Sequence, residues 1–269
     1  MTYTLHLGEE LVGDFGSLEG IAGELHTIGQ VQGPFLSFAE GQLLGPLRRW
    51  ALDHRRWRPE EHDNGEIQIR AGDEVISGSL HVGPLEPVVA FGARESGVVH
   101  EIIFKAPCLD AVPQHAQEEW EAWSYRDSLA PARWLELSTA RRRALLFVTR
   151  LASRSHAGQT CLLSHYVVDG RLAQDYPGLF LAIGEAIEGP RGYMGADLDA
   201  LADRLMDYTH PSSGCTITWE YGERARLALA AGEWRREGWR TSADIPQEAC
   251  LFSAINTVFR DLGIDVVVQ

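Results

Sequence analysis

Aspartates between residues 197 and 207 are the residues of this chain whose type and spacing most clearly suggest chemistry. Asp199, Asp203 and Asp207 are spaced by four, so on a helix they line up along one face. Carboxylates on a rigid helix can receive charge-assisted, often bidentate hydrogen bonds from the arginines of a partner. Aspartates at such a spacing also suit a hard cation such as Mg²⁺, or they form a solvated acidic face without a ligand. The spacing alone leaves these interpretations open.

A helix is predicted for the segment that carries these carboxylates. Leu198, Leu201 and Leu205 recur at i, i+3 and i+7 and form one apolar stripe, which must face a core. Asp197 is suited to cap the start of the helix, because its side chain can accept a hydrogen bond from a free backbone N–H. Like charges four residues apart cost about a few tenths of a kcal/mol per pair. The acidic row is therefore locally unfavourable.

The elements around this helix predict an α/β domain at residues 160–269. Apolar runs indicate strands, and segments with helical periodicity indicate helices. The expected strands are residues 162–168, 215–219 and 264–268, and the expected helices are residues 177–187, 197–207 and 248–262. Strands that alternate with helices require crossover connections, which place the strands side by side in parallel. We therefore expect a small parallel sheet with packed helices.

Residues 1–155 are expected to form a separate α+β domain of uncertain type and unknown function. The expected strands are residues 3–7, 66–70, 74–82 and 98–104, and the expected helices are residues 35–50 and 116–128. The segment 131–151 fits either a helix or a pair of strands. The small and polar residues 152–160 predict a linker between the two domains.

The charge of the chain favours basic partners. The sequence has 38 Asp plus Glu against 24 Lys plus Arg, which gives a net charge of −14 at pH 7. Such a field repels nucleic acid, so direct nucleic-acid binding is not expected. An acidic composition is also common among proteins for which it serves solubility alone.

Other features of the composition predict a cytoplasmic protein. The chain begins without a basic and apolar signal segment, and no apolar run is long enough to cross a bilayer. The four cysteines are scattered, which argues against a disulfide framework and against a structural zinc site. No nucleophile–base pair can be recognised, so we assign no catalytic residue, no metal and no cofactor.

The motif Tyr193-Met194-Gly195, followed by Asp197-Leu198-Asp199-Ala200-Leu201, lies at the start of the acidic helix. The flanking segments that accompany it are residues 166–170, 179–187, 217–220, 258–261 and 265–268. In this order the segments resemble the barstar family, the intracellular inhibitors of barnase-type ribonucleases. The resemblance covers residues 162–269, about two fifths of the chain. It implies an inhibitor or immunity protein, not an enzyme, that occludes the active site of a basic ribonuclease or related toxin.

The resemblance also implies partner-binding roles for individual positions. Tyr193 matches an aromatic residue of the binding loop, and Gly195 matches the tight turn that enters the binding helix. Asp199 and Asp203 match the two acidic residues that enter the ribonuclease active site, where Asp203 occupies the phosphate site. Asp261 matches a glutamate of the last helix that also faces the enzyme.

Several positions of this surface depart from the family pattern. Ala202 stands where a family member has tryptophan, Met206 where it has threonine, and Tyr208 aligns with a second tryptophan. Asp207 extends the acidic row and is counted with the partner-binding residues. Residues 222–249 have the character of an insertion. The acidic centre is therefore retained while the aromatic rim is altered, which bears on the identity of the target more than on the mode of binding.

Two other functions remain open at this stage. One is an enzyme in which residues 1–155 are catalytic and the C-terminal domain only regulates them. The other is an adaptor that keeps the fold but has lost inhibition, which the changes at Ala202 and Met206 would allow.

Overall fold

The chain forms two compact units, Met1–Gln117 and Glu118–Gln269. The structure is a computed structural model, and it describes residues 2–7, 9–19, 25–28, 31–53, 64–71, 74–75, 79–94, 96–123, 131–154, 164–207, 214–230 and 250–269. No helix among these residues is long and apolar enough to span a membrane.

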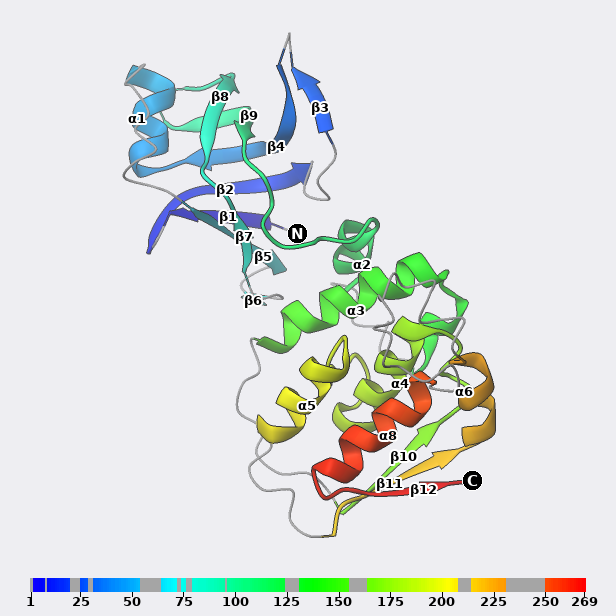
Figure 1. Cartoon of the computed structure of the whole chain (residues 1–269). Helices are drawn as coiled ribbons and strands as arrows, with labels where there is room; N and C mark the ends of the chain where they lie inside the picture. The colour runs from blue at the N-terminus through cyan, green and yellow to red at the C-terminus, as the bar shows by residue number, and fades with distance from the viewer. Residues whose placement is uncertain are drawn as a thin grey trace. The chain divides into compact units, whose positions relative to one another are not determined.

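An antiparallel sheet forms the centre of the N-terminal unit (Figure 1). Its strands are β1 (Thr2–Leu7), β2 (Glu10–Glu19), β3 (Leu25–Ile28), β4 (Val31–Leu43), β5 (Gly65–Ala71), β6 (Glu74–Val75), β7 (Leu80–Val82), β8 (Glu86–Phe91) and β9 (Val98–Lys105). Neighbouring strands run in the order β6-β5-β1-β2-β4-β9-β8, while β3 pairs with β4 and β7 pairs with β5. Helix α1 (Gly45–Asp53) follows β4 and packs against β2.

Three phenylalanines from neighbouring strands pack in the core of this sheet. Phe15, Phe38 and Phe104 come from β2, β4 and β9, and each is at most 1% exposed. The ring centroids of Phe15 and Phe38 lie 4.7 Å apart, and those of Phe38 and Phe104 lie 5.7 Å apart. A shift of one residue in pairing would turn these rings to the opposite face, so their burial fixes the register of the three strands.

The helix expected at residues 35–50 is wrong for its first half. Strand β4 extends through Leu43, and α1 begins only at Gly45. Phe35, Leu36 and Phe38 are all buried. Phe35 and Leu36 are consecutive, so they point to opposite faces of the sheet. A strand that is buried on both faces loses the alternation of apolar and polar residues, so its pattern does not distinguish it from a helix.

Other elements of this part of the chain agree with the sequence or resolve an open choice. Helix α2 (Ala116–Trp123) confirms a helix there, and residues 124–128 of its expected range lie outside the described residues. The segment 131–151 is helical, with a 3₁₀ turn η3 (Arg133–Glu136) and helix α3 (Thr139–Arg154). Strands β2, β3 and β8 were not expected from the sequence.

The C-terminal unit is an α/β fold built on a parallel sheet, in the order β10-β11-β12. Its elements after α3 are β10 (His165–Asp169), α4 (Tyr176–Glu188), α5 (Leu198–Asp207), β11 (Thr216–Glu220), α6 (Gly222–Ala228), α8 (Leu251–Asp261) and β12 (Asp265–Val268). The expected small parallel sheet with packed helices is confirmed. Helix α6 lies in the segment expected to be an insertion, of which residues 231–249 lie outside the described residues.

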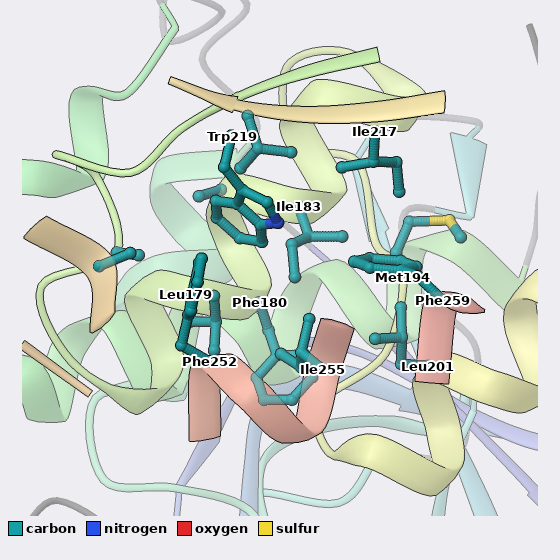
Figure 2. Packing of buried hydrophobic residues seen from close by; sticks show 14 of the residues in the cluster. Leu179, Phe180, Ile183, Met194, Leu201, Ile217, Trp219, Phe252, Ile255 and Phe259 are labelled. Atoms are coloured by element: carbon teal, nitrogen blue, oxygen red, sulfur yellow. The ribbon is translucent and has the colours of Figure 1, made fainter. Parts of the chain in front are cut away.

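Side chains from α4 and α8 meet the central strand of the parallel sheet to form the core (Figure 2). Trp219 of β11 is fully buried, and its indole Nε1 donates a hydrogen bond to Asn256 Oδ1 of α8 over 2.9 Å. The Trp219 ring also meets the edge of Phe252 at a centroid distance of 5.0 Å. The indole therefore buries its apolar surface and still has a hydrogen-bond partner for its N–H. Both contacts join α8 to the sheet.

A buried ion pair joins α3 to the start of α4. Arg142 Nη2 lies 3.0 Å from Asp175 Oδ2, and both side chains are 9% exposed. Asp175 Oδ2 also accepts a hydrogen bond from Thr139 Oγ1 over 2.6 Å, while Asp175 Oδ1 caps α4 by accepting one from Gly178 N over 2.9 Å. A single carboxylate thus caps a helix, accepts a hydrogen bond from a hydroxyl and pairs with a buried guanidinium.

The expected linker at residues 152–160 does not coincide with the division between the compact units. Helix α3 continues through Arg154, and the division falls after Gln117. Trp134 and Leu146 belong to the same buried cluster as the side chains of α4, α8 and the parallel sheet. Residues 152–154 of the expected linker therefore belong to a helix of the C-terminal unit, and residues 155–160 lie outside the described residues. Functional domains at residues 1–155 and 160–269 remain a prediction.

The Asp175→Ala substitution is expected to lower the free energy of unfolding of the C-terminal unit by about 3–5 kcal/mol, because it leaves Arg142 buried without its partner. The control is Asp197→Ala, which removes a helix cap without a buried ion pair and is expected to cost about 1 kcal/mol. Urea unfolding followed by circular dichroism measures both. Equal losses would contradict the role given to the ion pair.

Truncation tests whether α3 is part of the C-terminal fold. A fragment of residues 118–269 is expected to unfold cooperatively. A fragment of residues 160–269 lacks Trp134 and Leu146 and is therefore expected to have a lower unfolding midpoint. Each large apolar side chain removed from a core costs roughly 2–5 kcal/mol, which a small domain cannot easily lose. Thermal unfolding compares the two fragments, and equal midpoints would show that α3 is dispensable.

Candidate protein-binding surface

The loop between α4 and α5 turns sharply at Gly195. This residue has a φ of +123°, and a Cβ at this position would lie 2.5 Å from the backbone nitrogen of Leu201. Glycine suits both the positive φ and the close approach. Asp197 then caps the helix, because its Oδ1 accepts a hydrogen bond from Ala200 N over 2.7 Å. The turn and the cap place the first residues of α5.

Helix α5 buries one face and exposes its carboxylates. Leu201 and Leu205 are 0% and 2% exposed, whereas Asp199, Asp203 and Asp207 are exposed. The apolar face holds α5 in the core of the unit, where the helix packs against α8. The predicted amphipathic helix is confirmed, and its burial determines which side chains face solvent.

The two central carboxylates have no cation to neutralise them within the described part of the chain. Among those residues, no ion pair or hydrogen bond involves the side chain of Asp199 or Asp203. Asp207 Oδ2 lies 3.9 Å from Arg204 Nη1, and the Asp207 side chain is 70% exposed. These groups can therefore accept charge-assisted hydrogen bonds from a cationic partner.

Arg204, the one arginine of α5, is directed to the end of α4. Its Nη2 donates to Glu188 Oε1 over 2.8 Å, and the two side chains are 26% and 17% exposed. The other oxygen, Glu188 Oε2, accepts a hydrogen bond from the backbone N–H of Tyr193 over 3.0 Å. Glu188 thus connects the end of α4 to both the loop and the acidic helix.

A second carboxylate lies near the start of the loop. Glu185 Oε2 accepts a hydrogen bond from the backbone N–H of Ala132 over 2.9 Å. Burial raises the pKa of the Glu185 carboxyl. Sequence reasoning missed Glu185 and Glu188, because acidic residues at the C-terminal end of a helix oppose its dipole and carry no recognisable local signal. Their partners are 53 and 16 residues away in the chain.

The remaining positions predicted to bind a partner differ in exposure. Met206 is 57% exposed and Ala202 is partly exposed, so both can contact a partner. Asp261 is exposed at the end of α8, the helix that packs against α5. Tyr193 is 5% exposed and lies in the buried cluster. Its side chain therefore offers little area to a partner, in contrast to the binding-loop aromatic that the sequence suggests.

The carboxylates of α5 are poorly arranged for a cation. Side chains four residues apart on a helix stand roughly 5–6 Å apart at Cβ and point outward, whereas a hard cation needs several oxygens converging on one point. Within the described ranges, no group of three or more His, Cys, Asp or Glu side chains could hold a metal ion.

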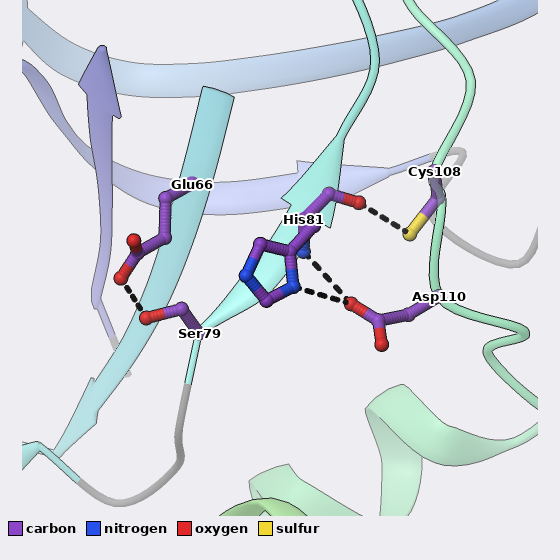
Figure 3. Close-up of polar contacts among 5 residues, drawn as sticks. All are labelled: Glu66, Ser79, His81, Cys108 and Asp110. Carbon is purple, nitrogen blue, oxygen red and sulfur yellow. Dashed lines mark hydrogen bonds and ion pairs between the residues drawn. The ribbon is translucent and has the colours of Figure 1, made fainter. Parts of the chain in front are cut away.

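A polar cluster in the described part of the N-terminal unit contains side chains of types that occur in catalytic sites (Figure 3). His81 Nδ1 lies 3.4 Å from Asp110 Oδ2, and the same oxygen accepts a hydrogen bond from His81 N over 2.8 Å. Cys108 Sγ contacts the backbone oxygen of His81, not its imidazole. Burial raises the pKa of the Cys108 thiol, which keeps it protonated and unreactive. The contacts of His81, Asp110 and Cys108 therefore attach the segment after β9 to β7, and the Cys108 thiol and the His81 imidazole do not form a nucleophile–base pair.

These features define the C-terminal unit as a small α/β domain that presents an acidic helix. Residues 163–250 match the model of the Barstar family, described as barstar (barnase inhibitor). The chain therefore contains a Barstar-family region, which spans about a third of its length. No curated protein and no solved structure matches the chain.

The family match contains the acidic helix and the loop that enters it. It ends before α8 and β12, so the predicted role of Asp261 depends on the sequence resemblance and on the packing of α8 against α5. Tyr208 lies outside the described residues.

The Gly195→Ala substitution is expected to destabilise the C-terminal unit, because the methyl group would meet the start of α5. The control is Gly214→Ala, since Gly214 has a similar φ of +126° with nothing within 4 Å of the added Cβ. Backbone strain of this kind costs about 1–3 kcal/mol, and the contact with Leu201 adds to it only at Gly195. Chemical unfolding that gives equal losses for both variants would contradict the close approach.

Proposed function

We propose that this chain inhibits a basic ribonuclease or a related toxin, and that it does so by inserting the carboxylates of α5 into the active-site cleft of the target. The observation that carries the proposal is the exposed pair Asp199 and Asp203, on a helix inside a Barstar-family region. The role is that of an immunity protein, which protects the cell that makes the toxin.

The chemistry of the target explains why carboxylates would block it. A ribonuclease stabilises a phosphodiester transition state, so its cleft carries cationic side chains. A carboxylate that takes the place of the scissile phosphate receives charge-assisted hydrogen bonds from these side chains. The net charge of −14 adds a long-range attraction that speeds the encounter at low salt.

The anchoring of α5 favours tight binding. The helix is held by Leu201 and Leu205 on its buried face and by the Asp197 cap at its start. Side chains on a helix that is already ordered lose less conformational freedom on association than side chains on a loose segment. Asp203 lies opposite the buried leucines, at the centre of the exposed face, and we assign it the position closest to the phosphate site.

The residues around the acidic centre suggest a target whose surface next to the active-site cleft differs from that of barnase-type enzymes. Ala202 and Met206 are exposed or partly exposed at positions where the resemblance implies tryptophan and threonine. The small side chain of Ala202 beside the flexible thioether of Met206 suits a target whose apolar surface has an irregular shape. The specificity of the inhibitor is therefore assigned to these two positions, and its affinity to the carboxylates.

Asp203→Asn keeps the shape of the side chain and removes its charge, so the cations of the target would be left unpaired. The dissociation constant is expected to rise at least about 30-fold, which corresponds to roughly 2 kcal/mol. The control is Glu220→Gln, which removes one charge from an exposed position on β11 and leaves α5 intact.

The measurement uses a panel of basic bacterial ribonucleases, one of them of the barnase type. Calorimetry gives the affinities, and assays of RNA cleavage at low and high salt give the inhibition. Binding by wild type, with loss for Asp203→Asn and little change for Glu220→Gln, is the expected result. Absence of binding to every member of the panel, or equal affinity of the two variants, would refute the proposal.

A further inference from the structure

We infer that Glu188 is a positioning residue of the acidic surface, which keeps Arg204 away from Asp199 and Asp203 and limits it to a long contact with Asp207, so that the target meets an anionic face. This inference rests on the proposed inhibitor function. It is carried by contacts at the end of α4 that lie apart from the carboxylates assigned to the target.

Arg204 is the side chain that could neutralise the surface from within. It follows Asp203 directly and precedes Asp207 by three residues, a spacing at which helical side chains are neighbours. Its Nη1 already lies 3.9 Å from Asp207 Oδ2. A small rotation of the guanidinium would therefore shorten this ion pair to direct contact on the face that the target approaches.

Glu188 holds the guanidinium in the competing arrangement. The distance from Arg204 Nη2 to Glu188 Oε1 is 2.8 Å, and Glu188 is 17% exposed where Asp207 is 70% exposed. A less exposed pair is less screened by water and salt, so Glu188 is the stronger partner. Arg204 Nε is buried and has no hydrogen-bond partner among the described residues. The contact between Arg204 Nη2 and Glu188 therefore determines the direction of the Arg204 side chain.

The loop fixes the direction of Glu188 in turn. Its second oxygen accepts the backbone N–H of Tyr193, whose ring lies in the core. The carboxylate is thus oriented before Arg204 meets it, which lowers the entropy cost of the pair. Because Glu188 and Arg204 cancel each other's charge beside the helix, Asp199 and Asp203 present their charges without an adjacent free cation.

A double-mutant cycle separates this electrostatic role from simple support of the loop. Glu188→Gln keeps an oxygen for the Tyr193 N–H and removes the charge that holds Arg204. The dissociation constant for the ribonuclease that wild type binds is expected to rise roughly threefold to tenfold, the effect of one uncompensated charge about 10 Å from the cations of the target. Arg204→Gln alone should bind as tightly as wild type or more tightly.

The double variant Glu188→Gln/Arg204→Gln is the decisive member of the cycle. It is expected to recover wild-type affinity, because the arginine of α5 that Glu188 holds is no longer present to be released onto the surface. Glu220→Gln changes the net charge by the same amount as Glu188→Gln and controls for the long-range field. The rate of association with the ribonuclease should fall equally for Glu188→Gln and Glu220→Gln. The rate of dissociation should rise only for Glu188→Gln.

The outcomes distinguish this inference from the proposed function. Equal weakening in Glu188→Gln and in the double variant would show that Glu188 only supports the loop, and would overturn the inference while inhibition stands. A crystal structure of free Glu188→Gln is expected to show the 3.9 Å separation of Arg204 and Asp207 shortened to that of a direct ion pair. Arg204 in its original place would also overturn the inference. This second readout needs no target, so it decides the inference even where the chain inhibits no ribonuclease.

Discussion

The burial of the leucines of α5 is the interaction on which the acidic surface depends. An isolated helix with aspartates at every fourth position would be penalised by about a few tenths of a kcal/mol for each like-charged pair. Leu201 and Leu205 are almost completely buried, and a buried leucine contributes roughly 1.5–3 kcal/mol. The core therefore outweighs the repulsion along the exposed face. It also fixes the rotation of the helix, so the same contacts that stabilise α5 determine where its carboxylates point.

Carboxylates have two different uses in the C-terminal unit. Asp175, Glu185 and Glu188 are partly or largely buried and accept hydrogen bonds from backbone N–H groups or basic side chains of other segments. Asp199 and Asp203 are exposed and have no such partner among the described residues. The first group holds the loop and the helix ends in place, and the second remains available. The acidic residues of this unit therefore form two groups: carboxylates that stabilise the structure and carboxylates that we assign to a partner.

The sequence predicted those parts of the unit that local patterns encode. The stripe of Leu198, Leu201 and Leu205 and the cap at Asp197 follow from short-range chemistry, and they recur in the structure. The turn at Gly195, which the family resemblance implied, is also present. The alternation of strands and helices also sufficed to predict the parallel sheet. The family resemblance supplied the candidate roles of the acidic residues, which no periodicity could have indicated.

Interactions between distant segments were not predictable in this way. The described part of strand β4 begins with two consecutive buried residues, Phe35 and Leu36, so it lacks the strict alternation that identifies a strand. The pair Arg142–Asp175 and the contacts of Glu188 join positions that are separated by helices or loops. The burial of Tyr193 likewise depends on neighbours from other elements. These features decide how the candidate site is supported, and only the three-dimensional structure places them.

The topology of the parallel sheet has a consequence for how the acidic surface forms during folding. His165 pairs with Thr216, and Thr216 pairs with Asp265, so each strand finds its neighbour about fifty residues away. Contacts of such long range close large loops before they gain any enthalpy, which slows folding and makes it cooperative. Helix α5 lies in the chain between the first two of these strands. A nascent or partly unfolded chain would therefore lack the acidic surface, and the closure of the sheet would set the delay between synthesis and the formation of that surface.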